Sequence, residues 1–148
     1  MEIYETARVV ASLATAIGVA IAAWQIRRNA EQTRTAFEDS LNKEYRELMR
    51  PVPLNALVGE TVAEKEAELA KDAIYNYLDF CNQQVYLRKK KRVRKATWLE
   101  WQEGMKTNFS LPLFTEVAQL VFARLPEIFS ELRKVRELGF NVDPAEWR

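Results

Sequence analysis

The hydrophobic pattern of the chain begins with one long apolar segment near the amino terminus. Residues Val9–Ile26 run for 18 positions without a charged side chain, which is close to the lower limit for a helix that crosses a bilayer. Charged residues flank the segment, and an aromatic residue lies near each end: Tyr4, Glu5 and Arg8 on one side, and Trp24, Arg27 and Arg28 on the other. Such flanks are typical of membrane helices. The pattern therefore predicts a transmembrane anchor over residues 1–28.

Two other interpretations of this segment stay open. A central helix buried in a soluble bundle shows the same run of apolar residues. A cleaved signal peptide is the weaker alternative: Ala20 and Ala22 resemble a cleavage site, but Glu2 and Glu5 are acidic where a signal peptide is positive.

The predicted anchor also carries a ridge of small residues. Its strong hydrophobic residues favour insertion by only about 2 to 4 kcal/mol, so association with a partner would help it insert. Ala14, Gly18 and Ala22 stand four residues apart, which is the spacing that lets two membrane helices approach closely. We therefore expect self-association through this face and a homo-oligomer; the alternative is that these residues merely fill an Ala-rich helix.

The basic residues that follow the segment predict its orientation. Arg27, Arg28 and Arg34 come after it, whereas the side chains before it are net acidic. The positive-inside rule then places residues 29–148 in the cytoplasm, and the predicted location of the anchor is the cell inner membrane. The unpaired Cys81 agrees with a reducing compartment.

The rest of the chain shows helical periodicity and no useful length of strand-like alternation. Apolar spacings of three and four predict successive helices over about 27–49, 61–89, 97–108, 110–125 and 128–138. Pro51 and Pro53 end the first of these, which continues the anchor without a helix breaker. The predicted fold class is all-α: a single transmembrane helix that continues into a cytosolic bundle of about four to five helices.

Local motifs predict where helices begin. They are capping boxes at Thr61 with Glu64 and at Thr97 with Glu100, and single caps at Ser110 and Asp143.

The apolar faces predict the core. Cys81 lies on the stripe of the helix over 61–89, so we interpret it as a small buried hydrophobe rather than a reactive thiol. Trp98 and Trp101 are expected to anchor the core rather than line a ligand site. The apolar residues of the loop over 51–60 are expected to pack against a neighbour: Leu54, Leu57 and Val58.

Composition removes most catalytic chemistry. The 148 residues include no His and one Cys, which excludes Ser-His-Asp triads, Cys-His dyads, HExxH zinc sites and disulfide frameworks. Neither a P-loop nor a GxGxxG motif occurs. The sequence therefore predicts a protein that is not an enzyme and holds no metal or cofactor.

One charged feature stands apart, at residues 88–95, which read RKKKRVRK. Seven of these are basic in a chain whose net charge is +1: Arg88, Lys89, Lys90, Lys91, Arg92, Arg94 and Lys95. Four interpretations stay open. The run is a solvated helix end favoured by the helix dipole, a contact for anionic lipid headgroups, a site for the phosphates of a nucleotide or nucleic acid, or a contact for an acidic protein.

The order of residues over 75–119 resembles a known family. It combines an aromatic helix that ends in YLRKKK, a WLEWQEGM segment and then NFSLPLF. This resembles the bacterial domain of unknown function 4760 family, and the likeness extends to the hydrophobic amino-terminal helix and so covers nearly the whole chain. It implies a small single-pass protein with a cytosolic helical domain and carries over no activity and no functional residues. The basic run is longer than the family's pattern.

Three functions follow as hypotheses. The first is a non-enzymatic, self-associating, single-pass membrane protein with a cytosolic binding or regulatory domain. The second is a membrane effector, for example in antiphage defence, that senses an anionic nucleotide or nucleic acid through residues 88–95 and perturbs the membrane. The third is a soluble helical adaptor whose first helix is core.

Overall fold

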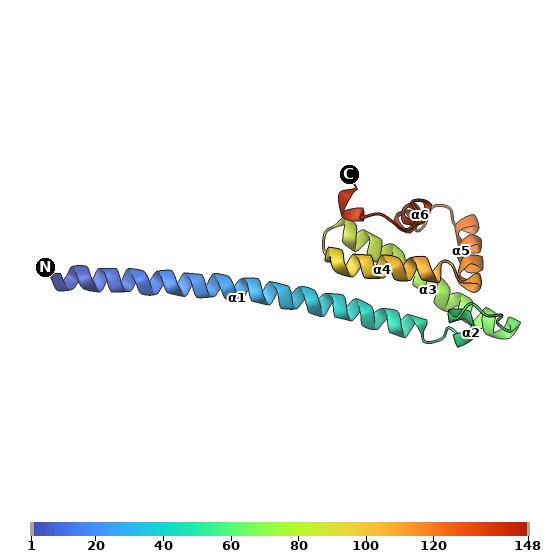
Figure 1. The fold of residues 1–148 in the computed structure, drawn as a ribbon, viewed down its shortest axis with the longest axis horizontal. Coiled ribbons are helices and arrows are strands. Elements are labelled where there is room, and N and C mark those ends of the chain that lie inside the picture. The colour runs from blue at the N-terminus through green and yellow to red at the C-terminus, as the bar shows by residue number, and fades with distance from the viewer. Residues whose placement is uncertain (1, 148) are drawn as a thin grey trace. The chain divides into compact units, whose positions relative to one another are not determined.

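The computed structural model describes residues 2–147, and over that range the chain is helical with no β-strand (Figure 1). The predicted all-α class is therefore confirmed. The elements are α1 (Glu2–Met49), α2 (Leu54–Leu57), α3 (Glu64–Lys89), α4 (Lys95–Asn108), α5 (Pro112–Arg124), α6 (Ser130–Glu137) and the 3-10 helix η1 (Pro144–Glu146).

The helices form two compact units, and the boundary between them falls inside α1. The amino-terminal unit ends at Phe37, and the carboxyl-terminal unit begins at Glu38. The predicted limits of the anchor and of the remaining domain, residues 1–28 and 29–148, stay predictions.

Helix α1 runs through the predicted anchor and on to Met49 without a break. The sequence explains its length, because residues 2–49 contain no proline and Gly18 is their single glycine. Pro51 and Pro53 follow its end, as predicted, because neither proline can donate a backbone hydrogen bond to continue a helix.

In the carboxyl-terminal unit, α3 is the central helix and contacts α4, α5, α6 and η1. Its buried face confirms the predicted stripe from Ala70 to Val85, including Cys81, whereas Ala63, expected at the start of that stripe, is exposed. Trp98 of α4 is fully buried, and Trp101 is partly buried against the same core. The core therefore forms where the three- and four-residue spacings placed it.

The predicted caps are wrong at three of the four positions. Helix α3 begins only at Glu64, so Thr61 precedes its cap. Thr97 lies inside the first turn of α4, where its hydroxyl donates to the Glu38 carboxylate at 2.9 Å. Ser110 instead donates to the Thr107 carbonyl at 2.6 Å. Asp143 is the cap that is confirmed, since it accepts from the Ala145 N–H at 3.0 Å.

The loop after α1 also differs from prediction. Leu54, Leu57 and Val58 are exposed rather than packed. In the short helix α2, which contacts α5, the buried residue is Ala56, and Val52 of the preceding turn is also buried. The sequence analysis expected a loop here. The segment is helical instead, and the helical geometry decides which of its residues face inward, so the predicted buried positions were wrong.

Candidate functional site

The seven basic residues of the run 88–95 lie at the end of α3, in a turn and at the start of α4. The turn closes α3 with a Schellman motif: the Lys91 N–H bonds the Arg88 carbonyl and the Arg92 N–H bonds the Leu87 carbonyl. Lys91 has a φ of 58°, where glycine is the usual residue. Val93 is buried beneath the turn, so the loop is tied down rather than loosely solvated.

Arg88 connects three parts of the fold through its hydrogen bonds. Its Nε and Nη2 donate to the two carboxylate oxygens of Asp143 at 2.7 and 2.6 Å, and its Nη1 donates to the Val93 carbonyl at 2.8 Å. One guanidinium thus joins α3, the turn and the segment before η1. The hydrogen bond from Arg88 lowers the pKa of Asp143, as expected for a carboxylate that a guanidinium holds in its charged form.

Two further basic residues are also engaged in the fold. The Lys89 ammonium pairs with Glu131 of α6 at 2.6 Å. The Glu38 carboxylate is buried, accepts from the backbone N–H of Arg94 at 2.8 Å and lies 3.7 Å from the Arg94 guanidinium. Glu38 therefore takes the place of a cap for α4, because it binds the backbone at the start of that helix.

The exposed part of the run is smaller than the sequence suggested. We name as the basic turn its four exposed residues, Lys90, Lys91, Arg92 and Lys95. Lys95 is the first residue of α4, a position at which a positive charge opposes the helix dipole. The structure places these four cations on one turn next to Arg94, which is bound to Glu38.

The predicted self-association residues Ala14, Gly18 and Ala22 lie on α1 and are exposed. A Cβ added at Gly18 would meet nothing within 4 Å. The large apolar side chains around them are also exposed, from Val9 to Ile26. By length and composition, α1 is a helix that is able to span a membrane.

The polar side chains of this segment are satisfied by the helix itself. The Ser12 hydroxyl donates to the Arg8 carbonyl and the Thr15 hydroxyl to the Ala11 carbonyl, both at 2.9 Å. Hydroxyls bonded in this way no longer need water, which lowers the cost of placing them in lipid. At the far end, the Arg28 guanidinium lies 5.4 Å from the centre of the Trp24 ring.

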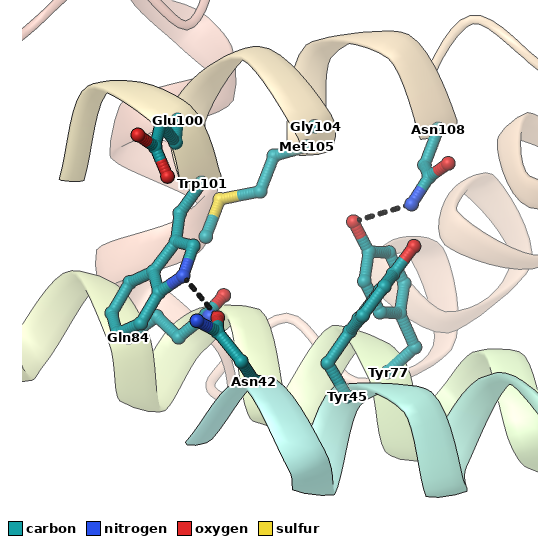
Figure 2. A pocket seen from close by; sticks show the side chains of 9 residues that line it. All are labelled: Asn42, Tyr45, Tyr77, Gln84, Glu100, Trp101, Gly104, Met105 and Asn108. Atoms are coloured by element: carbon teal, nitrogen blue, oxygen red, sulfur yellow. Dashed lines mark hydrogen bonds between the residues drawn. The ribbon is translucent and has the colours of Figure 1, made fainter. Parts of the chain in front are cut away.

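The carboxyl-terminal unit also contains a cavity of about 190 Å³ between the end of α1, α3 and α4, which we name the aromatic cavity (Figure 2). Its apolar wall includes Tyr45, Tyr77, Trp101 and Met105. Figure 2 shows two hydrogen bonds in the wall: the Trp101 N–H donates to Asn42 at 2.9 Å, and the Asn108 amide donates to the Tyr77 hydroxyl at 3.0 Å.

Gln84 is the unusual residue of the aromatic cavity. It lines the cavity from α3 and is only 4% exposed as a whole residue, and its amide atoms are accessible at the cavity rather than sealed in the core. Sequence reasoning missed this residue and the cavity. Gln84 follows two other polar residues of α3, Asn82 and Gln83, and nothing in the linear pattern brings it together with Asn42 and Trp101.

Other chemistry in the described residues is sparse. Burial raises the pKa of the Cys81 thiol to about 12, so this cysteine is a poor nucleophile at neutral pH. Between residues 2 and 147 no three His, Cys, Asp or Glu side chains gather as a metal site would require.

The comparisons with known proteins give no relative. No family model matches the chain, and no curated protein and no solved structure matches it significantly.

Proposed function

We propose that this chain is a single-pass membrane protein whose carboxyl-terminal helical unit is a binding module rather than an enzyme. The observation that carries the proposal is the state of residues 9–26. They form continuous helix, contain no charge, and expose every large apolar side chain they have. A soluble protein rarely exposes so long an apolar surface, because each square ångström costs hydration free energy.

The dimensions fit a bilayer. Eighteen residues at the helical rise extend about 27 Å, close to the roughly 30 Å of a hydrocarbon core. The internally bonded hydroxyls of Ser12 and Thr15 support this assignment. Since Arg27 and Arg28 follow the segment, the proposal places the carboxyl-terminal unit in the cytoplasm and the anchor in the bacterial inner membrane.

Membrane fractionation tests the anchor. We expect the full chain to stay in the membrane pellet after a carbonate wash, whereas a variant that lacks residues 1–28 becomes soluble and keeps its helical circular dichroism. Release of the full chain by the wash would contradict the proposal and would favour the soluble adaptor. A variant with Ile17→Lys and Ile21→Lys is a second check, because two charges at the centre of a span strongly oppose insertion.

The basic turn gives the binding module its proposed first contact, an anionic lipid headgroup. Four exposed cations share the turn, and each is worth about 1 kcal/mol at an anionic surface. The turn is held by Glu38, and only residues 27–37 separate Glu38 from the charge-free segment. The short length of this intervening segment limits how far the turn can lie from the bilayer surface.

A fluorescence experiment tests this contact in the full chain reconstituted into nanodiscs. A fluorophore on an Ala96→Cys variant reports the basic turn, because Cys81 is fully buried and stays unlabelled. We expect lipids with a quencher on the headgroup to quench it strongly in anionic bilayers. Zwitterionic bilayers should quench it less. In a variant that combines Lys90→Glu, Arg92→Glu and Lys95→Glu, quenching in anionic bilayers should fall to the level of zwitterionic bilayers.

The control for this experiment carries the same change in net charge elsewhere. Lys65→Glu, Lys106→Glu and Arg124→Glu alter three exposed cations away from the basic turn, and their quenching should equal that of the wild type. Equal quenching in the basic-turn variant would contradict lipid contact. Quenching that falls only when a nucleotide is added would favour the effector hypothesis, which stays a prediction.

Two further parts of the proposal stay predictions. They are self-association through Ala14, Gly18 and Ala22, and membership of the domain of unknown function 4760 family.

A further inference from the structure

We propose that the aromatic cavity binds a small, uncharged, planar heteroaromatic ring, of the size and edge chemistry of a nucleobase or a nicotinamide. The proposal concerns a site within the carboxyl-terminal unit and does not depend on the membrane anchor. It rests on the contents of the cavity wall, on Gln84 and on the charge of the lining residues.

Gln84 is the observation that points to a ligand. Its side-chain amide atoms are accessible at the cavity, so they are able to exchange hydrogen bonds with water for hydrogen bonds with a ligand. Gln102 of α4 shows the usual arrangement: it is 6% exposed, and its amide donates to the Val142 carbonyl at 2.6 Å. Gln84 is as buried as Gln102 but offers its donor and its acceptor to the cavity.

The charge of the lining selects against anions. Glu100 is the single charged residue that lines the cavity, and the cations of the basic turn are not among the lining residues. A phosphate or carboxylate would meet no positive partner here and would face the Glu100 carboxylate. The ligand class of the aromatic cavity is therefore different from that of the basic turn.

The shape and surface of the cavity favour a ring. A volume of about 190 Å³ is below that of the usual drug-sized pocket, so it admits one small ring system. The rings of Tyr45, Tyr77 and Trp101 line it (Figure 2), and aromatic rings stack on the faces of planar heterocycles. A glutamine amide presents an N–H donor beside a C=O acceptor. These two groups are able to pair with an acceptor and a donor that are adjacent on the edge of a heterocycle.

Calorimetry on the full chain in detergent micelles tests the proposal, with adenine, uracil and nicotinamide as probes and with choline and glucose as comparison compounds. We expect at least one heterocycle to bind with a Kd between about 10 µM and 1 mM. Binding of none of the three at 10 mM would overturn the proposal. Binding of choline or glucose in preference to all three would overturn the ligand class.

Two matched variants place the ligand at Gln84. We expect Gln84→Met to weaken binding at least tenfold, because it removes the donor and the acceptor at the cavity and nearly keeps the side-chain volume. Gln102→Met should lower Tm, since it breaks the bond to Val142, and should leave Kd within twofold. Unchanged affinity in Gln84→Met would overturn the assignment of the site.

Discussion

The Trp98→Ala variant is expected to lose about 4 kcal/mol of unfolding free energy, the largest effect we predict for one substitution. Trp98 is 0% exposed, and its indole N–H donates to the Val142 carbonyl at 2.9 Å. The truncation therefore removes the hydrophobic contribution of the largest side chain in the core, opens a cavity and breaks a hydrogen bond. A small domain unfolds with about 5–15 kcal/mol in total, so the variant should be close to unfolding at 37 °C.

The measurement is urea denaturation of the full chain in detergent, followed by near-ultraviolet circular dichroism. Trp101→Ala is the matched control, three residues away on the same helix. Trp101 is only partly buried and donates to Asn42 at the edge of the aromatic cavity, so we expect it to cost about 2 kcal/mol. Equal losses of unfolding free energy in the two variants would contradict the prediction that the deeper burial of Trp98 makes its truncation more costly.

The prediction of the fold worked where one local rule decided the outcome. The spacing of apolar residues placed the buried stripe of α3 correctly from Ala70 onward, because that stripe needs only the helical period and a neighbour to pack against. Pro51 marked the end of α1 correctly. Gly139 follows the end of α6 with a φ of 70°, a value that glycine adopts without strain.

The prediction failed where a distant residue decided the outcome. Thr97 matched a capping box, yet its hydroxyl donates to Glu38 at 2.9 Å, which lies far away in the sequence. A capping box assumes that the nearest donors and acceptors pair. When another helix supplies a buried carboxylate, that local preference no longer decides where the helix begins.

The same limit applies to the candidate site. The sequence located the basic run, but counting charges treated its seven residues as equivalent. The structure separates Arg88, Lys89 and Arg94, which pair with carboxylates of other elements, from the exposed basic turn. The aromatic cavity was beyond sequence reasoning because Asn42, Gln84 and Trp101 come from three helices.

Asp143→Asn is expected to cost about 3 kcal/mol, because it leaves the Arg88 guanidinium buried without its counter-charge. Both side chains are only 11% exposed, and two short hydrogen bonds join them. The replacement amide keeps the size of Asp143 and can still accept from Ala145, so the loss reports the ion pair rather than the cap of η1. Glu47→Gln is the control, since its pair with Arg50 is exposed, and we expect it to cost less than about 1 kcal/mol.

The cost of Asp143→Asn should also depend on pH in a defined direction. Arg88 lowers the pKa of Asp143 in the folded protein, whereas the unfolded value is about 3.9. The stability that the ion pair contributes is therefore fully present above about pH 4 and is lost as the pH falls through the lowered folded pKa. The difference between wild type and variant should stay constant from pH 5 to 7 and shrink toward zero in stronger acid.

The double variant Arg88→Met with Asp143→Asn tests whether the uncompensated charge of Arg88 causes the loss of stability in Asp143→Asn. If an uncompensated charge causes the damage, removing that charge as well should recover part of the 3 kcal/mol, so the double variant is more stable than Asp143→Asn alone. Recovery will be incomplete, because the Val93 carbonyl also loses its bond to Arg88. A double variant that is less stable than the single one would show that Arg88 stabilises the turn chiefly through Val93, independently of Asp143.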